Sequence, residues 1–282
     1  MQAIRSWCSG LAVLATLFAA SAHAAESYDN CIGYVDALPA TISTQGVWCL
    51  RADQSTAIST GYAIELAANN VTLDCNGYKL GGLAAGAGTN ASGIYAASGR
   101  LNATVRNCSV RGFRFGIQLL GDGHRIEANR IDGNTEFGIV TVGDGNQVLD
   151  NLVYGTGGRP GEASAYAIWA TGQGVRVLGN DIDGVDPGGV DGAKVSYGIY
   201  AQNSLVAGNR ITGLVAAGAG AARGIILYGR SVTRGNLLVQ FDPVAGTTGI
   251  WGNAASACHG DSIKGYETAF TLCESAGMVT QP

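Results

Sequence analysis

The feature that most constrains the fold is an internal repeat. The segment FGIQLLGDGHRIEANRIDGN, which begins at Phe115, is followed 22 residues later by FGIVTVGDGNQVLDNLVYGT, with the same order of residue types. Both segments carry Phe-Gly-Ile, then Gly-Asp-Gly, then an apolar residue three positions before an Asn and another two positions after it. A repeat of this regularity indicates that one structural unit is stacked on itself.

Seven copies of this pattern run along the chain. Each copy has a small residue followed by Ile, and these pairs begin at Gly93, Gly116, Gly138, Ala167, Gly198, Gly224 and Gly249. The middle copies then carry Asn129, Asn151, Asn180, Asn209 and Asn236, and the equivalent place at the two ends holds Cys108 and Asp261. The short β-type runs between Gly, Asn and Asp predict strands rather than helices. We therefore predict an all-β fold, a single-stranded right-handed parallel β-helix, which is a solenoid of three-strand coils.

The Asn and the residue after each Ile have separate expected roles. We predict that the Asn points inward at the bend between the second and third strands and bonds to the equivalent amides above and below. The residue after Ile is expected to point outward, because neighbouring strand residues alternate. Down the stack this outward row reads Tyr95, Gln118, Val140, Trp169, Tyr200, Ile226 and Trp251.

The outward row contains the candidate substrate-binding residues Tyr95, Gln118, Trp169, Tyr200 and Trp251. Exposed aromatic rings suit the apolar faces of sugars. The alternative is that these rings only support the loops that fold over them.

Extra residues accumulate at one turn, after the third strand, and loops on one side of a solenoid build one wall of a groove. The charged candidates in these loops are Arg159 and Glu162 for substrate binding, and Asp186, Asp191, Lys194 and Arg223 for catalysis. Asp186 and Asp191 are also the candidate ligands of a Ca²⁺ ion, which prefers oxygen ligands. The nearby Asp181 and Asp183 fit a solvated ladder of charges on the outer face of the third strand.

The repeated Gly-Asp-Gly contains Asp122 and Asp144, two carboxylates that could share a proton as acid and base. Asp between two glycines is also what a tight turn prefers, and we favour the turn. His124 follows the first of these turns and is a further candidate acid or base.

The front of the chain has the features of a cleavable signal peptide, which we assign to residues 1–24. An apolar run from Leu11 to Ala20 precedes the small-residue cleavage site Ala22-His23-Ala24, and this run is too short to span a membrane. The protein is therefore expected to be secreted or periplasmic. The mature chain would keep Cys31, Cys49, Cys75, Cys108, Cys258 and Cys273.

An even number of cysteines in an exported chain predicts disulfides, although sequence order alone does not decide among the many pairings. We expect Cys31–Cys49 and Cys258–Cys273 to clasp the ends and Cys75–Cys108 to join neighbouring repeats. The mature chain is expected to be one domain, residues 25–282, with caps over about 25–60 and 265–282 that cover the open ends of the solenoid.

The charge of the chain bears on its partners. A formal net charge of −4 and three lysines offer no basic footprint for nucleic acid and no polybasic run for anionic lipid. We expect a polysaccharide partner, no nucleic acid and no insertion into a membrane.

The segments NVTLDCNGYKLGG, from Asn70, and ATVRNCSVRGF, from Ala103, resemble the opening coils of pectate-lyase-like parallel β-helix repeat proteins, which are widespread among secreted bacterial proteins. The resemblance covers roughly Ala63 to Gly265 and implies the β-helix fold. Lyases of this fold use Ca²⁺ to neutralise a uronate carboxylate while an Arg or Lys abstracts the adjacent proton.

The same fold also serves hydrolases, epimerases, metal-handling periplasmic proteins and adhesins, so it does not fix the activity. The characteristic motifs of the pectin hydrolases and pectate lyases are not matched here, and no residue role is carried over from them. We expect a protein that binds an extracellular polysaccharide, with cleavage by a lyase or hydrolase reaction as one hypothesis. The alternative is a non-catalytic carbohydrate-binding or cell-surface structural protein.

Overall fold

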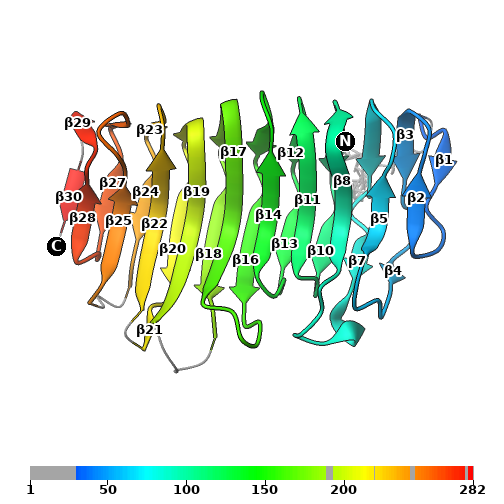
Figure 1. Ribbon diagram of the computed structural model, residues 1–282, viewed down its shortest axis with the longest axis horizontal. Helices are drawn as coiled ribbons and strands as arrows, with labels where there is room; N and C mark the ends of the chain where they lie inside the picture. Colours follow the sequence, from blue (N-terminus) through cyan, green and yellow to red (C-terminus); the bar gives the residue numbers. More distant parts are fainter. Residues whose placement is uncertain (1–29, 189–192, 219, 242–244, 277–278, 282) are drawn as a thin grey trace, which may run out of the picture.

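The computed structural model describes residues 30–188, 193–218, 220–241, 245–276 and 279–281. The predicted signal peptide and Asp191 lie outside these residues. The described chain winds into an all-β parallel solenoid, whose coils follow one another in sequence order along the long axis (Figure 1). The helical content of these residues is the single turn η1 (Leu83–Ala85). The predicted fold class is confirmed.

The first sheet runs the length of the solenoid and is made of the first strand of each coil. These strands are β2 (Ala40–Ile42), β5 (Tyr62–Leu66), β8 (Ser92–Leu101), β11 (Phe115–Asp122), β14 (Phe137–Val142), β17 (Ser164–Leu178), β19 (Ala193–Ala207), β22 (Ala221–Tyr228), β25 (Thr247–Trp251) and β28 (Thr268–Thr271). Each pairs in parallel with the next, so the Ile of every repeat lies in register with the Ile of the next coil. These isoleucines have no exposed surface, which places them in the core as predicted.

The second sheet follows a turn in each coil. Its strands are β1 (Gly33–Tyr34), β3 (Gly46–Cys49), β6 (Val71–Asp74), β9 (Thr104–Arg106), β12 (Arg125–Glu127), β15 (Gln147–Leu149), β23 (Val232–Arg234), β26 (Ala257–His259) and β29 (Glu274–Ala276). β17 and β19 run through this turn without a break, so their second halves pair with β15 and β23. These two long strands join the first and second sheets.

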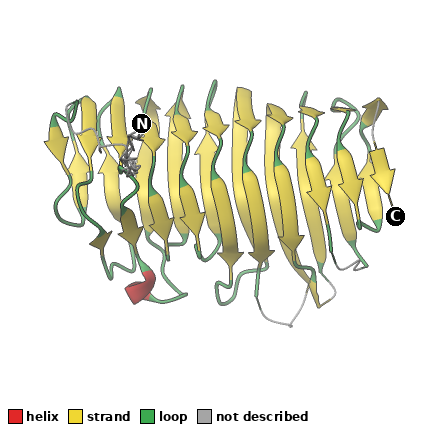
Figure 2. Cartoon of the chain, turned by 180° about the vertical axis from the view of Figure 1, so that it is seen from behind, coloured by secondary structure: helices red, strands yellow, loops and turns green. Residues whose placement is uncertain are grey.

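The third sheet closes each coil. Its strands are β4 (Gln54–Ser55), β7 (Lys79–Gly81), β10 (Ser109–Arg111), β13 (Arg130–Asp132), β16 (Leu152–Gly157), β18 (Asp181–Asp186), β20 (Arg210–Leu214), β24 (Leu237–Val239), β27 (Ser262–Lys264) and β30 (Val279–Gln281). A short strand, β21 (Ala217–Gly218), pairs antiparallel with the start of β19. Figure 2 shows the strands from behind and the loops that project at one edge of the stack.

An amide ladder runs through the core between the second and third sheets, as the repeat predicted. The Nδ2 of each ladder Asn donates to the Oδ1 of the next at 2.9 Å, from Asn129 through Asn151, Asn180 and Asn209 to Asn236. Each Asn is at most 2% exposed. Because every amide also bonds to the backbone of the coils beside it, the ladder fixes the register of successive coils.

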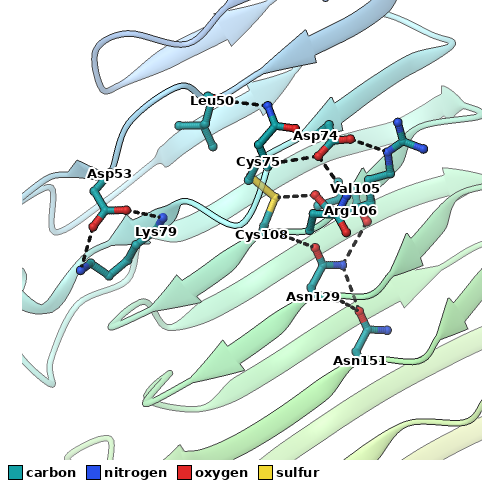
Figure 3. The surroundings of a disulfide bond; sticks show 12 residues. Leu50, Asp53, Asp74, Cys75, Lys79, Val105, Arg106, Cys108, Asn129 and Asn151 are labelled. Atoms are coloured by element: carbon teal, nitrogen blue, oxygen red, sulfur yellow. Dashed lines mark hydrogen bonds and ion pairs between the residues drawn. A yellow bond between two sulfur atoms is a disulfide. The ribbon is translucent and has the colours of Figure 1, made fainter. Parts of the chain in front are cut away.

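The ends of the amide ladder hold the two residues that replace Asn in the repeat. The Cys108 backbone N–H donates to Asn129 Oδ1 at 2.9 Å, and Asn236 Nδ2 donates to Asp261 Oδ1 at 2.7 Å. Asp261 Oδ2 accepts a second bond from the Thr233 hydroxyl, so this fully buried carboxylate is satisfied. Figure 3 shows the Cys108 end of the ladder.

The Gly-Asp-Gly repeat forms turns between the first and second sheets, as favoured from the sequence. A Cβ on Gly143 would lie 2.1 Å from the Gly121 carbonyl oxygen, and Gly143 has a φ of +139°, so only glycine fits. Asp122 Oδ1 accepts the Asp144 backbone N–H at 2.8 Å, and Asp144 Oδ1 accepts the Gln173 N–H at 2.7 Å. These carboxylates link one coil to the next by accepting backbone N–H groups.

The three predicted disulfides are present, Cys31–Cys49, Cys75–Cys108 and Cys258–Cys273. The bond between Cys75 and Cys108 joins adjacent coils at one end of the amide ladder (Figure 3). Within the segment expected to cap the N-terminal end, β2, β3 and β4 already pair in parallel with β5, β6 and β7. This segment therefore adds a coil to the stack.

Candidate functional site

The predicted outward row lies on the first sheet in the predicted register. Tyr95, Gln118, Val140, Trp169, Tyr200, Ile226 and Trp251 follow one another as partners in adjacent strands. Trp169 stacks on Tyr200 with ring centroids 4.0 Å apart. Tyr95 stacks on Tyr62, one strand earlier, at 3.7 Å. The five candidate substrate-binding residues of this row are all partly exposed.

A second aromatic row, which the sequence reasoning missed, runs beside the first. Phe115, Phe137, Tyr166 and Tyr197 lie in register, and their rings stack at centroid distances of 4.8, 5.0 and 4.4 Å. Tyr166 also meets Trp169 edge to face at 5.1 Å, which joins the two rows. We call the surface formed by these two rows the aromatic face.

The second row was missed because strict alternation fails at this place. Period-two alternation would turn the residue two positions before the inward Ile into the core as well. Instead Gly116 and Ile117 both face inward, since a Cβ on Gly116 would meet Asn134 and Ile131 in the interior. Phe115 and Gln118 are therefore both left on the outer side. The signal was present in the repeat, because an aromatic residue precedes the small residue in four consecutive copies.

The stacking determines which part of each ring a ligand can reach. Neighbouring rings in the second row and the Trp169–Tyr200 pair lie within 12° of parallel. Their faces therefore lie against the ring of the adjacent coil, and their edges point away from the sheet. Burial raises the pKa of Tyr166 to about 12 and also raises the pKa of Tyr200, so both phenols stay protonated at neutral pH and can donate hydrogen bonds.

The loop of residues 158–163, between β16 and β17, lies beside the start of β17, which carries Tyr166 of the second aromatic row. Its Arg159 reaches back past two coils, donating to the Thr89 carbonyl and, at 2.9 Å, to Asn90 Oδ1. Arg159 Nε also lies 3.5 Å from Glu136 and 3.4 Å from Glu162. The loop is thus fastened along the edge of the aromatic face by a mostly buried arginine.

The same cluster contains a further arginine. Arg114 Nε lies 2.7 Å from Glu136 Oε2, its Nη2 lies 3.7 Å from Glu162, and its guanidinium sits over the Phe115 ring at 5.1 Å. Arg114 and Glu136 were not among the candidates. Each directly precedes an aromatic residue of the second row, so the ion pairs border that row.

Lys194 joins the candidates Arg159 and Glu162. It lies at the start of β19, and its Nζ donates to the Glu162 backbone carbonyl. Gly158, Arg159, Pro160, Gly161, Pro187, Gly188 and Lys194 line a hollow of about 230 Å³ between the two inserted loops. Two predicted site residues, Arg159 and Lys194, therefore line one hollow, and Glu162 contacts both of them.

Arg223 and Asp186 lie apart from this cluster. Arg223 was expected in an inserted loop, but it lies on β22 as the register partner of Tyr197, with its guanidinium 5.3 Å from the Trp251 ring. That loop expectation is wrong because β22 starts two residues earlier, at Ala221. Asp186 ends β18, is exposed, and accepts the Gly188 N–H at 2.8 Å.

The candidate calcium site is incomplete in the part of the chain that the structure describes, where no three His, Cys, Asp or Glu side chains gather as metal ligands. Its second proposed ligand, Asp191, lies outside that part. Asp181 and Asp183 have other partners, because Asp181 pairs with Arg210 at 2.8 Å and Asp183 accepts from the Thr212 hydroxyl at 2.7 Å. Asp181 thus has the charged neighbour expected on the outer face of the third strand, whereas the partner of Asp183 is a neutral hydroxyl.

His124 is not positioned for acid–base catalysis, which corrects the sequence expectation. The side chain is fully buried, its Nδ1 accepts the Ala103 N–H at 3.0 Å, and its Nε2 lies 3.2 Å from the Leu120 carbonyl oxygen. These contacts fix the neutral tautomer with the proton on Nε2. The next coil holds Asn146 in the equivalent place, so His124 fills a structural position.

His124 should make stability depend on pH. Burial lowers the pKa of His124, so the unfolded chain takes up a proton at a higher pH than the folded chain. The contribution is present above about pH 6.5 and is lost as pH falls from there through the lowered pKa. We expect His124→Asn, which introduces the residue that the next coil carries at this place, to flatten this decline in urea unfolding measured between neutral and acidic pH. His259→Asn, which replaces an outward residue on β26, should keep the decline; equal curves for all three proteins would contradict the assignment.

The geometry defines a class, a parallel β-solenoid with an outward aromatic face and an ionic loop cluster beside it. Residues 42–213 match the model of the right handed beta helix region family, which is more than half of the chain, and the protein belongs to this family. Its likeness to pectate-lyase-like β-helix proteins is thereby confirmed at the level of the fold. No curated protein sequence matches the chain. Among the described residues, no helix is long and apolar enough to cross a membrane.

Several solved structures share the fold. The enzymatically active domain of tailspike protein 2 of bacteriophage CBA120 is 13% identical, with a TM-score of 0.60 over 90% of this chain and 41% of that one. The Dettilon tailspike protein is 16% identical, with a TM-score of 0.50 over 87% of this chain and 55% of that one. Pectate lyase Pel9A is 12% identical, with a TM-score of 0.46 over 82% and 69%. The chain thus spans about half or less of the tailspike chains, and identities this low show the fold alone.

Proposed function

We propose that this protein binds an extracellular polysaccharide along the aromatic face. The main support is that two rows of aromatic side chains lie on the outer side of the first sheet. The ion pairs of Arg114 and Arg159 with Glu136 and Glu162 border these rows. Ring edges supply apolar contact for sugar CH groups, and the Tyr200 phenol donates to a sugar hydroxyl.

The polymer would lie along the solenoid axis, because both rows run from coil to coil. In this arrangement Tyr95, Gln118, Trp169, Tyr200 and Trp251 contact successive sugar units. Arg159 and Glu162 hold the loop wall in place, and Lys194 and Arg223 offer positive charge at that side for an acidic sugar. Arg223 has no carboxylate partner within the described ranges, so its guanidinium can pair with a uronate carboxylate.

Cleavage is the finer part of the proposal. Uronate β-elimination would need a base for the C5 proton, and Lys194 is the amine beside the aromatic face that we assign to this role. Glycosidic hydrolysis would instead need a carboxylate pair, for which Asp186 and Asp191 are the proposed residues. A Ca²⁺ ion on these two aspartates would supply charge neutralisation at an acidic sugar.

A specific observation favours the alternative, a non-catalytic carbohydrate-binding or cell-surface structural protein. Glu136 and Glu162 are both engaged by Arg114 and Arg159, so these two carboxylates beside the second aromatic row hold the loop in place. A binding protein needs only the rings. Localisation outside the cytoplasm fits the three disulfides and belongs to the same proposal.

Replacing Trp169 or Tyr200 tests the proposed contact surface. We expect Trp169→Ala and Tyr200→Ala each to weaken binding of the recognised polysaccharide about thirtyfold, the size of a strong interface contact. Binding is measured by affinity electrophoresis or calorimetry, with circular dichroism to show an unchanged fold. Tyr154→Ala is the control, because Tyr154 is 46% exposed on the third sheet. Undiminished binding by both variants would refute the placement on the aromatic face.

A further inference from the structure

A third outward row on the first sheet, beyond the aromatic face, leads to a second hollow. Val142, Thr171 and Gln202 are register partners on β14, β17 and β19. Thr171 and Gln202 lie two residues after Trp169 and Tyr200, on the same side of their strands. This row therefore borders the aromatic face on the side opposite the inserted loops.

The hollow has a definite size and lining. It measures about 320 Å³ and is lined by Val142, Gly143, Asp144, Thr171, Gly172, Gln173, Gln202 and Asn203. Val142 is 42% exposed and offers the one large apolar surface of this lining. A volume of this size suits a single sugar ring better than a polymer segment.

The polar groups of the hollow are free to bind a ligand. The side-chain amides of Gln173 and Gln202 are exposed and have no hydrogen-bond partner within the residues described. Asp144 uses Oδ1 to accept the Gln173 N–H, which leaves Oδ2 as a further acceptor. By contrast, Asn203 Oδ1 already accepts the Arg230 N–H at 3.0 Å. Two amides and one carboxylate oxygen can together donate to and accept from several hydroxyl groups.

The charge of the lining selects the kind of sugar. No Lys or Arg side chain lines the hollow, and its one charged group is the Asp144 carboxylate. An anionic sugar would meet repulsion here, whereas the cations Lys194 and Arg223 lie toward the opposite side of the aromatic face. An apolar floor with uncharged donors and acceptors around it matches the hydroxyls and CH groups of a neutral hexose.

We propose that this hollow is a side subsite that binds one neutral hexose unit, a branch or substituent of a polysaccharide lying on the aromatic face. The inference rests on the proposed function, because the branch can reach the hollow only when the backbone of the polysaccharide lies on the aromatic face. Gln202 and Gln173 are the specificity-determining residues, because their amides form hydrogen bonds whose geometry depends on the orientation of the sugar hydroxyls. The recognised polymer is accordingly a branched or substituted one.

The test uses the protein with free glucose, galactose, mannose, galacturonate and glucosamine as probes in saturation-transfer NMR. We expect transfer to at least one neutral hexose, and about tenfold weaker affinity in the Gln173→Ala/Gln202→Ala variant, the loss of one to two uncharged hydrogen bonds. Gln147→Ala, on the outer side of the second sheet, is the control and should match the wild type.

The outcomes separate this subsite from the main site. Transfer to a neutral hexose that persists in Trp169→Ala but is weakened in the double glutamine variant supports the subsite. No transfer to any neutral sugar, or transfer confined to a charged one, overturns it even if the protein still retains a polysaccharide. A wrong proposal for the aromatic face would give a different result: the wild type would bind free hexose in the NMR experiment but would not be retained on any polysaccharide.

Discussion

Asn180→Ala should lower the free energy of unfolding by about 3 to 5 kcal/mol, because it removes the centre of the amide ladder. Asn180 Oδ1 accepts both the backbone N–H and the side-chain amide of Asn151, and its Nδ2 donates to Asn209 and to the Val148 carbonyl. All of these groups are buried, so alanine would leave several of them without a partner. Urea unfolding followed by circular dichroism measures the loss.

The neighbouring residue provides a matched control. Asp181 follows Asn180 directly but points outward, where it forms an ion pair with Arg210 in which both side chains are 48% exposed. Asp181→Ala should cost less than about 1 kcal/mol, as exposed ion pairs do. Similar losses for the two variants would mean that the amides do not hold the coils together.

Removing the Cys75–Cys108 disulfide should have the second largest effect. In the chain-entropy view, a bond that closes a loop of sequence separation 33 stabilises the fold by about 3 to 4 kcal/mol. The double variant Cys75→Ser/Cys108→Ser leaves no free thiol in this pair, and its thermal midpoint should fall accordingly. The loss should come with weaker protection of the Cys108 and Asn129 amides in hydrogen exchange, since Cys108 ends the ladder.

Ser109→Ala, an outward change beside Cys108, is the control for the disulfide variant. It should leave both the midpoint and the exchange pattern unchanged. A double serine variant as stable as the wild type would show that the ladder alone fixes the first coils, without help from the covalent bond.

The repeat predicted most of the fold because equivalent residues in successive copies occupy the same place in successive coils. Asn180 could be placed at an inward bend because Asn recurs there in five coils, and Trp169 could be placed on the outward row because it follows the Ile that recurs in every copy. The expected disulfide pairs, two at the ends and one between neighbouring repeats, are also present. The position of the Asp122 and Asp144 turns followed from the glycines beside them.

The parts of the site that were missed are those where the chain departs from the repeat. The row through Phe137 was missed because two consecutive residues face inward after it. The path of the loop at Arg159 depends on a side chain that contacts Asn90, 69 residues away in sequence, and no periodicity records such a contact. His124 was misassigned because it was compared with Asn146 by residue type, although both occupy the same buried place.

The proposed domain limits and signal peptide are open to a simple check. Mass spectrometry of the exported protein should give a chain that begins near residue 25, as the small-residue cleavage site predicts. That chain, residues 25–282, is the form to use in the binding experiments.

The central claim is that the solenoid binds a polysaccharide, and incubation with a panel of neutral and acidic polysaccharides tests it most directly. The assay follows retention on each polymer, unsaturated-uronate absorbance and reducing ends, with and without calcium. We predict retention of at least one polymer by the wild type and its loss in Trp169→Ala/Tyr200→Ala. Product formation would add an enzymatic activity and name the bond, whereas retention alone would identify a binding protein. Neither retention nor product on any polymer would contradict the account.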